Sequence, residues 1–354
     1  MPIPTEPIGS IPRPDELIEA LGSLNTGKIQ QSDYEQILDA ALLDTIRRFE
    51  QTESPVITDG EQAKPSFATY PLTGVNNLAA DGVTITFADG HTRQLPRLTG
   101  GPFRYGIYAE TYLKNAMRLT RVPVKQAVIS VSALSLLYPG ASIPGYSNEQ
   151  FEMDLLAETE SDIRRCLMAG AHCVQIDFTE GRLSLKLDPG GGLLRRFIAL
   201  NNQVLHGFTP EERSRIGVHS CPGGDRDSTH SATVDYAELL PALFSLAAGR
   251  FYLQLASEPD RKYVLGLIRE HLQPNQVVFI GVVDPIAARI ESPREVCAAV
   301  IEAVSFIPPE RLGTTDDCGF APFADDISTA RETAFEKIRA RVEGTRLAER
   351  ELGL

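Results

Sequence analysis

The sequence has no tryptophan, few cysteines and no long apolar run. Five cysteines in 354 residues are too few for a disulfide-stapled scaffold, so we expect reduced thiols and a cytoplasmic protein. No stretch of about 18 apolar residues is present, which argues against a membrane-spanning helix. The N-terminal segment MPIPTEPIGSIPRP lacks the basic and apolar regions of a signal peptide, so we expect no secretory leader.

Basic residues are also in deficit. The chain has 34 Lys and Arg against 47 Asp and Glu, a formal net charge of −13. Sequence-independent binding to nucleic-acid phosphates needs a basic face, and so does attraction to an anionic membrane. We therefore expect neither nucleic acid nor membrane as a partner. A hydrophobic content of 42% predicts a globular chain with a sizeable core.

Short apolar runs alternate with longer segments of helical spacing. Strands are expected at residues 8–14, 55–61, 124–134, 172–177, 215–221, 250–257, 276–284 and 311–319. Helices are expected at 15–24, at 31–50 with Ser32 as N-cap, from about Ser147, and at 325–347. Eight strands separated by helices predict a single α/β domain over residues 1–354, a (β/α)8 barrel. The alternative is an open doubly wound sheet, but no Gly-x-Gly-x-x-Gly follows the first strand.

Residues 81–99 break this pattern. They alternate apolar and polar side chains around Asp89-Gly90, which is typical of a tight turn between two strands. The sequence therefore predicts a β-hairpin inserted into a loop of the barrel.

Polar side chains follow the expected strands where the strands end. The residues with this placement are Ser10, Glu61, Asp177, His219, Cys221, Asp284 and Cys318. The carboxyl ends of barrel strands converge on one mouth, where catalytic groups lie. We therefore expect these side chains to face a common space.

A metal site is the sharpest of these expectations. His219 and Cys221 are two residues apart on a strand, so both side chains point to the same side. Imidazole and thiolate are zinc ligands, and Cys318 on the eighth strand offers a third. Three protein ligands leave one position open, as catalytic zinc sites do. The alternative is that these are ordinary core residues, since buried cysteine often acts as a small hydrophobe.

The loop after the fifth strand offers further candidates. Residues 223–227 form a Gly-Gly-Asp-Arg-Asp segment that either contacts substrate or is an ordinary turn. His230 in the same loop is a candidate for acid–base chemistry or for support of the metal ligands. Aromatic residues that flank the third strand are candidates for stacking on a flat methyl donor, or pack within the loops. They are Phe103, Tyr105, Tyr138 and Tyr146.

The motifs IGSIPRP, TDGE, VQID, GVHSC and DDCG, in this order, resemble the C-terminal catalytic barrel of cobalamin-independent methionine synthases. The resemblance implies a (β/α)8 barrel of the uroporphyrinogen-decarboxylase-like superfamily. It implies a catalytic zinc that binds the thiol of homocysteine, which receives a methyl group to give methionine. It also implies a methyl donor, either methylfolate or a methyl-corrinoid protein.

The resemblance carries roles to particular residues. His219, Cys221 and Cys318 match the zinc ligands of the family. The motif Ile8-Gly9-Ser10, together with Glu61 and Asp177, matches the positions that hold the amino-acid part of homocysteine. Two carboxylates beside a metal would pair with the ammonium group of that substrate.

The sequence departs from the family pattern at three places. Gln254 stands at the end of the sixth strand, where the family has a glutamate ligand. No histidine follows the seventh strand, so either Asp284 or His230 is the catalytic proton donor, or the donor differs. Asp177-Phe178-Thr179-Glu180 replaces the Asp-Glu-Pro motif of the fourth strand.

These departures keep two other functions open. One is a zinc-dependent thiol alkyltransferase that opens an epoxide with coenzyme M, although acidic Glu61 and Asp177 disfavour a sulfonated thiol. The other is a non-catalytic zinc- or thiol-binding protein.

Overall fold

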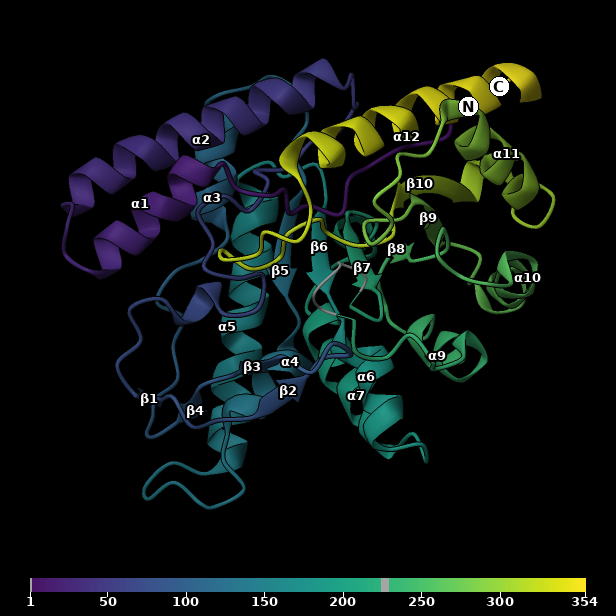
Figure 1. Cartoon of the computed structure of the whole chain (residues 1–354). Helices are drawn as coiled ribbons and strands as arrows, with labels where there is room; N and C mark the ends of the chain where they lie inside the picture. The colour runs from purple at the N-terminus through teal and green to yellow at the C-terminus, as the bar shows by residue number, and fades with distance from the viewer. Residues whose placement is uncertain (1, 224–228) are drawn as a thin grey trace.

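The computed structural model describes residues 2–223 and 229–354 and contains a six-stranded parallel sheet (Figure 1). Its strands, in spatial order, are β5 (Gln126–Ile129), β6 (Val174–Asp177), β7 (Ile216–Ser220), β8 (Arg250–Leu253), β9 (Val277–Val283) and β10 (Leu312–Asp316). Nearly every residue in these strands is buried. They lie within the six expected runs because parallel strands covered on both faces need continuous apolar segments.

Two extended segments close the sheet into a ring. The first bridges to β10 at Thr5, and the second bridges to the chain before β5 at Ile57. The two segments bind each other, since the Ile11 N–H donates to the Gly60 carbonyl over 3.0 Å. The barrel fold is confirmed, but the first two runs expected as strands are irregular. Prolines in both runs remove N–H donors that a strand ladder needs.

Helices follow most of the strands and cover the ring (Figure 1). The α-helices are α1 (Asp15–Asn25), α2 (Gln31–Gln51), α3 (Glu110–Met117), α4 (Val131–Leu134), α5 (Asn148–Met168), α6 (Glu180–Leu187), α7 (Gly192–Leu205), α8 (Pro210–Arg213), α9 (Tyr236–Leu243), α10 (Arg261–His271), α11 (Pro293–Val304) and α12 (Arg331–Leu352). Short 3-10 turns are η1 (Tyr70–Leu72), η2 (Ser135–Leu137) and η3 (Pro309–Arg311). None of these helices is long and apolar enough to cross a membrane within the described residues.

Two details of the helices differ from expectation. Gln30, not Ser32, is the N-cap of α2, and it forms a capping box with Asp33. The last helix begins at Arg331 rather than at residue 325. The segment before it is held in place because Phe323 bridges to Ser66 and its carbonyl accepts from Arg13 Nη1 over 2.8 Å.

The inserted hairpin is present. Strands β2 (Thr84–Thr86) and β3 (Thr92–Gln94) pair antiparallel across the Asp89-Gly90 turn. At its base, β1 (Leu78–Ala79) pairs with β4 (Arg97–Leu98). Figure 1 shows this hairpin near α4, α6 and α7. It therefore lies on the side of the barrel where the chain leaves the sheet strands.

A buried charge network fills the opposite end of the barrel. Glu6 accepts from Arg250 Nη1 over 2.7 Å and from the Tyr252 hydroxyl over 2.6 Å, and it lies 3.8 Å from Lys125 Nζ. Burial raises the pKa of Glu6, but the hydrogen bond from His172 and the charges of Lys125 and Arg250 outweigh burial and hold it at about 2. This carboxylate is therefore ionised at every ordinary pH.

Candidate active site

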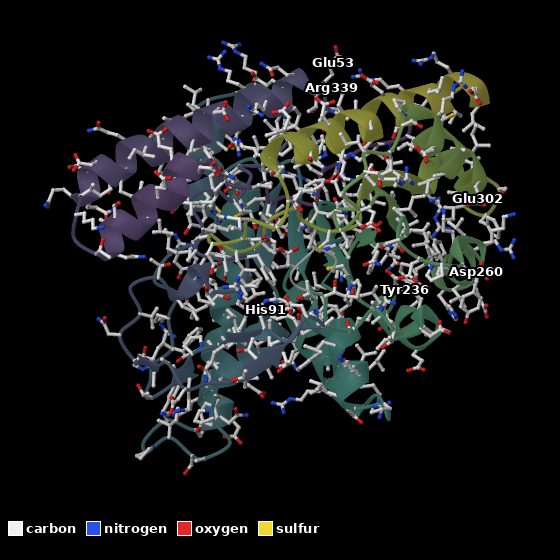
Figure 2. All side chains as sticks on the ribbon, viewed as in Figure 1. Glu53, His91, Tyr236, Asp260, Glu302 and Arg339 are labelled. Atoms are coloured by element: carbon white, nitrogen blue, oxygen red, sulfur yellow. The ribbon has the colours of Figure 1, made fainter. Side chains whose placement is uncertain are left out.

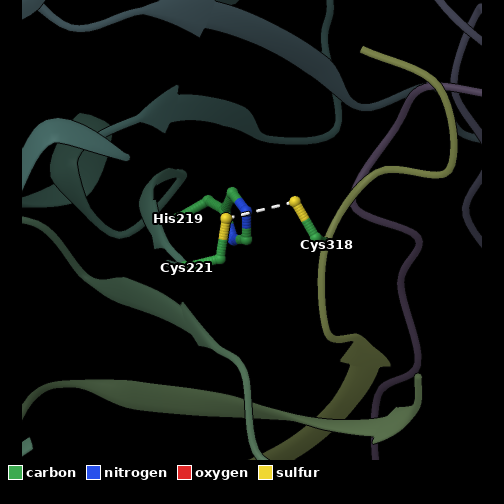
Figure 3. Close-up of side chains that lie close together, drawn as sticks. All are labelled: His219, Cys221 and Cys318. Carbon is green, nitrogen blue, oxygen red and sulfur yellow. Dashed lines mark hydrogen bonds between the residues drawn. The ribbon is translucent and has the colours of Figure 1, made fainter. Parts of the chain in front are cut away.

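Three expected metal donors lie together at the mouth of the barrel (Figure 3). His219 lies on β7, Cys221 is the first residue after the end of that strand, and Cys318 lies just beyond the end of β10. The ligand atoms of these three buried residues are all within 4.8 Å of one another. The two sulfurs are 3.1 Å apart, too far for a disulfide bond of about 2.05 Å.

This group fits a zinc ion. Both ring nitrogens of His219 are buried and have no hydrogen-bond partner among the described residues. Such an orphaned imidazole is costly unless a ligand completes it. One nitrogen and two sulfurs form a soft donor set of the kind that binds zinc, and the span of the atoms suits a single ion.

Gln254 directly follows β8, the strand beside β7. Its Nε2 donates to Ser257 Oγ over 2.6 Å, and Ser257 Oγ donates to Asp317 Oδ2 over 2.7 Å. An ionised carboxylate only accepts hydrogen bonds, so the Ser257 hydroxyl donates to Asp317 and accepts from the Gln254 amide. The amide nitrogen of Gln254 therefore faces Ser257. The other end, Gln254 Oε1, is buried and has no hydrogen-bond partner among the described residues.

The Glu61 carboxylate has an internal partner that the sequence analysis missed. Its Oε1 lies 2.9 Å from Nζ of the fully buried Lys64, which also donates to the Ala127 carbonyl. The charges of Glu61 and Asp59 keep the pKa of Lys64 above its ordinary value, against the lowering effect of burial. The backbone of Glu61 has a φ of +56°, a strained conformation for a non-glycine residue that is common at functional sites.

Asp177 ends β6 and pairs in register with His219 on β7. Its Oδ1 accepts from Gln175 Nε2 over 2.7 Å. Burial raises the pKa of Asp177 to about 6, against the lowering effect of the His219 charge. At neutral pH the carboxylate is still mostly ionised, so it can bind a cationic group.

The segment Ile8-Gly9-Ser10 packs against the loop that carries Cys318. Ser10 Oγ accepts from the Ala321 N–H over 3.2 Å, and the Ser10 carbonyl accepts from the backbone of residue 320. Gly319 permits this approach, because a Cβ there would lie only 2.1 Å from Ser10 Oγ. The close contact holds the I-G-S segment beside the sulfurs.

The two expected proton donors are placed differently from each other. His230 faces the site, its Nδ1 lies 2.9 Å from Ser231 Oγ, and burial lowers its pKa to about 4. Asp284 instead accepts from the Ile286 N–H over 2.9 Å and is not among the residues that line the site. Of the polar loop at 223–227, residues 224–227 lie outside the described residues.

A cavity of about 600 Å³ opens over the metal donors. The expected site residues that line it are Ile8, Gly9, Ser10, Glu61, Asp177, His219, Cys221, His230 and Cys318. Gln254 and Asp284 are not among its lining residues. Residues of β2, β3, α6 and α7 form much of the remaining wall. The cavity is much larger than one amino-acid substrate requires.

The aromatic residues of this cavity are not the ones expected. Phe103, Tyr105 and Tyr146 are buried in the core, and Tyr138 packs against that core. The phenylalanines that do line the cavity come from other loops, from the hairpin and from α7. They are Phe67, Phe87, Phe197 and Phe323.

Glu180 is a site residue that the sequence analysis did not select. It lines the cavity at the start of α6, and its Oε1 accepts from both Ser130 Oγ and Ser132 Oγ. Its Oε2 is buried and has no hydrogen-bond partner among the described residues. Burial raises the pKa of Glu180 to about 7, although the two serine hydroxyls favour the ionised form. In the sequence, Glu180 stood out only as part of Asp177-Phe178-Thr179-Glu180, which departs from the family motif.

Comparison with known proteins assigns the family. Residues 3–342 match the cobalamin-independent synthase catalytic domain. The chain belongs to this family. A methionine synthase from Sulfolobus acidocaldarius is 23% identical over 358 residues, covering 99% of this chain and 93% of that protein. A 5-methyltetrahydropteroyltriglutamate–homocysteine methyltransferase from Streptomyces coelicolor is 26% identical, covering 90% of this chain and 39% of that protein.

A solved member of the cobalamin-independent synthases has the same fold. The B12-independent methionine synthase from a Shewanella species, solved with selenomethionine, superposes with a TM-score of 0.79. The two are 20% identical, and the match covers 99% of each chain. The expected family and its barrel are both confirmed.

Proposed function

We propose that this chain is a zinc-dependent S-methyltransferase that transfers a methyl group to homocysteine and so forms methionine. The observation that carries the proposal is the buried group of His219, Cys221 and Cys318, whose donor atoms lie within 4.8 Å of one another. Family membership supports the reaction class, and the similar proteins named above are methionine synthases and homocysteine methyltransferases.

The metal would be held by His219 Nδ1 or Nε2 and by the two thiolates. Gln254 Oε1 is our proposed fourth protein ligand, because its amide nitrogen faces Ser257 and its oxygen has no hydrogen-bond partner among the described residues. Bound zinc would supply Lewis acidity that lets a thiol bind as its thiolate at neutral pH. An uncharged Gln254 leaves the site less negative than the glutamate of the family would.

The remaining residues would orient the amino acid. Asp177 is the proposed acceptor for the substrate ammonium, because it lines the cavity and is held in place by Gln175. Glu61 would act with Lys64 as a neutral pair, so it contributes less attraction than a lone carboxylate. We assign the backbone of Ile8-Gly9-Ser10 to the substrate carboxylate. Burial lowers the pKa of His230 to about 4, so its ring would be uncharged at neutral pH and would hold no extra proton to donate.

The test measures zinc content and methyl transfer on the purified protein. Methyl iodide serves as donor, because a simple electrophile needs no donor-binding site, and methionine is quantified against free homocysteine. We expect one zinc per chain and a faster rate than in solution. Cys318→Ser should lose both, whereas Cys297→Ser on α11, outside the cavity lining, should keep both.

X-ray absorption provides a second readout. The count of sulfur atoms around zinc should rise by one when homocysteine is added. A protein without zinc, or a Cys318→Ser variant that keeps zinc and activity, contradicts the proposal. Zinc without any turnover would instead favour a storage or thiol-binding role.

The coenzyme M alternative makes a different prediction. The described cavity wall combines Asp177 and Glu180 with few cations, and this repels a sulfonate. Homocysteine should therefore outcompete coenzyme M in the same assay.

A further inference from the structure

The cavity wall beyond the metal donors is largely apolar and aromatic. Phe67, Phe87, Phe197 and Phe323 line it, together with aliphatic residues of the hairpin, α6 and α7. Phe87 on the hairpin packs between His91 (labelled in Figure 2) at 4.6 Å and His230 at 6.0 Å, measured between ring centroids. This part of the cavity is where a methyl donor would lie if the proposed function holds.

The ionic groups of the wall leave a negative excess among the described residues. Arg93 is paired with Asp325 over 2.8 Å, and Glu61 is paired with Lys64 over 2.9 Å. The remaining described ionisable groups of the wall are Asp177, Glu180 and the exposed Lys186, whose Nζ donates to a backbone carbonyl. Glu180 is partly ionised at neutral pH, because burial raises its pKa to about 7. An anionic donor would find no buried, unpaired cation among the described residues of this wall.

Part of the excess negative charge in the cavity wall lies on Glu180. The side chain is 6% exposed, and its Oε2 lacks a hydrogen-bond partner among the described residues. Both serine hydroxyls bind the other oxygen, so the carboxylate is fixed in place while one oxygen remains unsatisfied. A buried carboxylate oxygen of this kind is costly unless a cation or a donor completes it.

Resting on the function proposed above, we propose that the methyl donor is an onium compound, a methylsulfonium or a methylated quaternary ammonium. Its cationic centre lies among the phenylalanines and against Glu180 Oε2. Aromatic faces bind such methylated cations through their ring quadrupole, and a nearby carboxylate adds charge attraction. Strongly hydrated cations would gain less from this wall because they would lose their water.

The reaction balances without an acid. The zinc that His219, Cys221 and Cys318 would hold would favour loss of the homocysteine thiol proton to solvent, and the thiolate sulfur would form a bond to the methyl carbon. The bond from that carbon to the onium sulfur or nitrogen breaks, and its electron pair stays with the onium atom. The leaving group departs as a neutral thioether or tertiary amine and takes up no proton. This matches a wall in which His230 is uncharged at neutral pH.

The two donors expected from family resemblance fit this wall less well. A methylfolate with a polyglutamate tail carries several carboxylates, which Lys186 alone among the described wall residues would have to balance. A corrinoid delivered by a second protein would not need an aromatic cavity of about 600 Å³. Both donors are outcomes of the experiment below.

The test compares donors on the zinc-loaded protein with homocysteine. Trimethylsulfonium, tetramethylammonium, methyltetrahydrofolate triglutamate and methylcobalamin are assayed for methionine, with methyl iodide as the reference electrophile. We expect turnover with trimethylsulfonium, with or without tetramethylammonium, and none with the folate. Turnover with methyl iodide but with neither onium overturns this inference and leaves the proposed function standing. No turnover with methyl iodide overturns both.

A variant then tests the placement of Glu180. Glu180→Gln should raise the KM for the onium at least about tenfold, whereas Glu238→Gln should leave that KM unchanged. The matched control is Glu238→Gln, which removes the same charge from an exposed position on α9. An unchanged KM in Glu180→Gln overturns the assignment, and if the variant does not fold the comparison of donors on the natural protein still decides.

Discussion

The buried pair of Lys64 and Glu61 gives the sharpest test of how this site is held. Lys64 is completely buried, and its ammonium touches Glu61, the Ala127 carbonyl and the face of Tyr70 at 4.7 Å from the ring centroid. Asp59, also buried, adds to the local negative charge and has its pKa raised by burial. Replacing Lys64 with methionine keeps the length of the side chain and removes only the ammonium.

The loss of stability in Lys64→Met comes from the charged and polar groups that stay buried without the ammonium. Removing one partner of a buried ion pair costs about 3–5 kcal/mol, because the other charge stays buried without compensation. Lys64→Met removes the cation that pairs with buried Glu61 and one of the donors to the Ala127 carbonyl, so we expect a loss of about 4 kcal/mol. At about 2.1 cal/mol/K per residue for the entropy of unfolding, this lowers the Tm by about 5 °C for the 354-residue chain.

Urea unfolding followed by circular dichroism measures the free energy for Lys64→Met, Glu61→Gln and the double variant. We expect a coupling energy of at least about 1 kcal/mol, because the double variant removes both charges together. Strictly additive losses, or a Lys64→Met protein as stable as the natural one, would refute the role assigned to this pair.

Three further outcomes are expected. Gln254→Glu adds a negative ligand and should tighten zinc binding about tenfold, and unchanged zinc affinity and rate would remove Gln254 from the metal. The pKa of Glu6 is about 2 against an ordinary 4.5, so its contribution of about 3 kcal/mol is complete above pH 4.5 and is lost as the pH falls to 2. Glu6→Gln should therefore flatten the acid dependence of the urea midpoint. Removing zinc with a chelator should lower the free energy of unfolding by about 3 kcal/mol when free zinc had been at about one hundred times its Kd, and zinc should restore it.

Much of the fold could be predicted from apolar runs. The strands from β5 to β10 lie inside the runs expected for them, because strands buried on both faces need continuous apolar sequence. For the two N-terminal extended segments, the sequence predicts their order along the chain but not their hydrogen bonds. Their prolines and turns replace ladder hydrogen bonds with contacts such as the Thr58 hydroxyl donating to the Gly9 carbonyl over 2.8 Å, and sequence periodicity does not encode these contacts.

The candidate site likewise has a part that the sequence predicts and a part that it does not. His219 and Cys221 could be placed together because a strand puts alternate residues on one side, and the barrel brings Cys318 to the same mouth. The pairing of Glu61 with Lys64 depends on an unusual left-handed backbone at Glu61, which residue identity does not predict. The aromatic lining depends on where an insertion and two loops come to rest, so the sequence left open whether its four aromatic candidates stack on a donor or pack internally.

The hairpin has a consequence for how metal and donor affect each other. The Ala88 N–H donates to the Thr229 carbonyl over 2.8 Å, which ties the hairpin to the loop that follows Cys221. Arg93 pairs with Asp325 in the segment that follows Cys318. One wall of the cavity is thus fastened to both stretches of chain that carry the sulfurs. Binding at the metal donors and binding against the hairpin should then be linked. A ligand bound against the hairpin should raise the affinity for the metal ion, and the metal ion should raise the affinity for that ligand by the same factor.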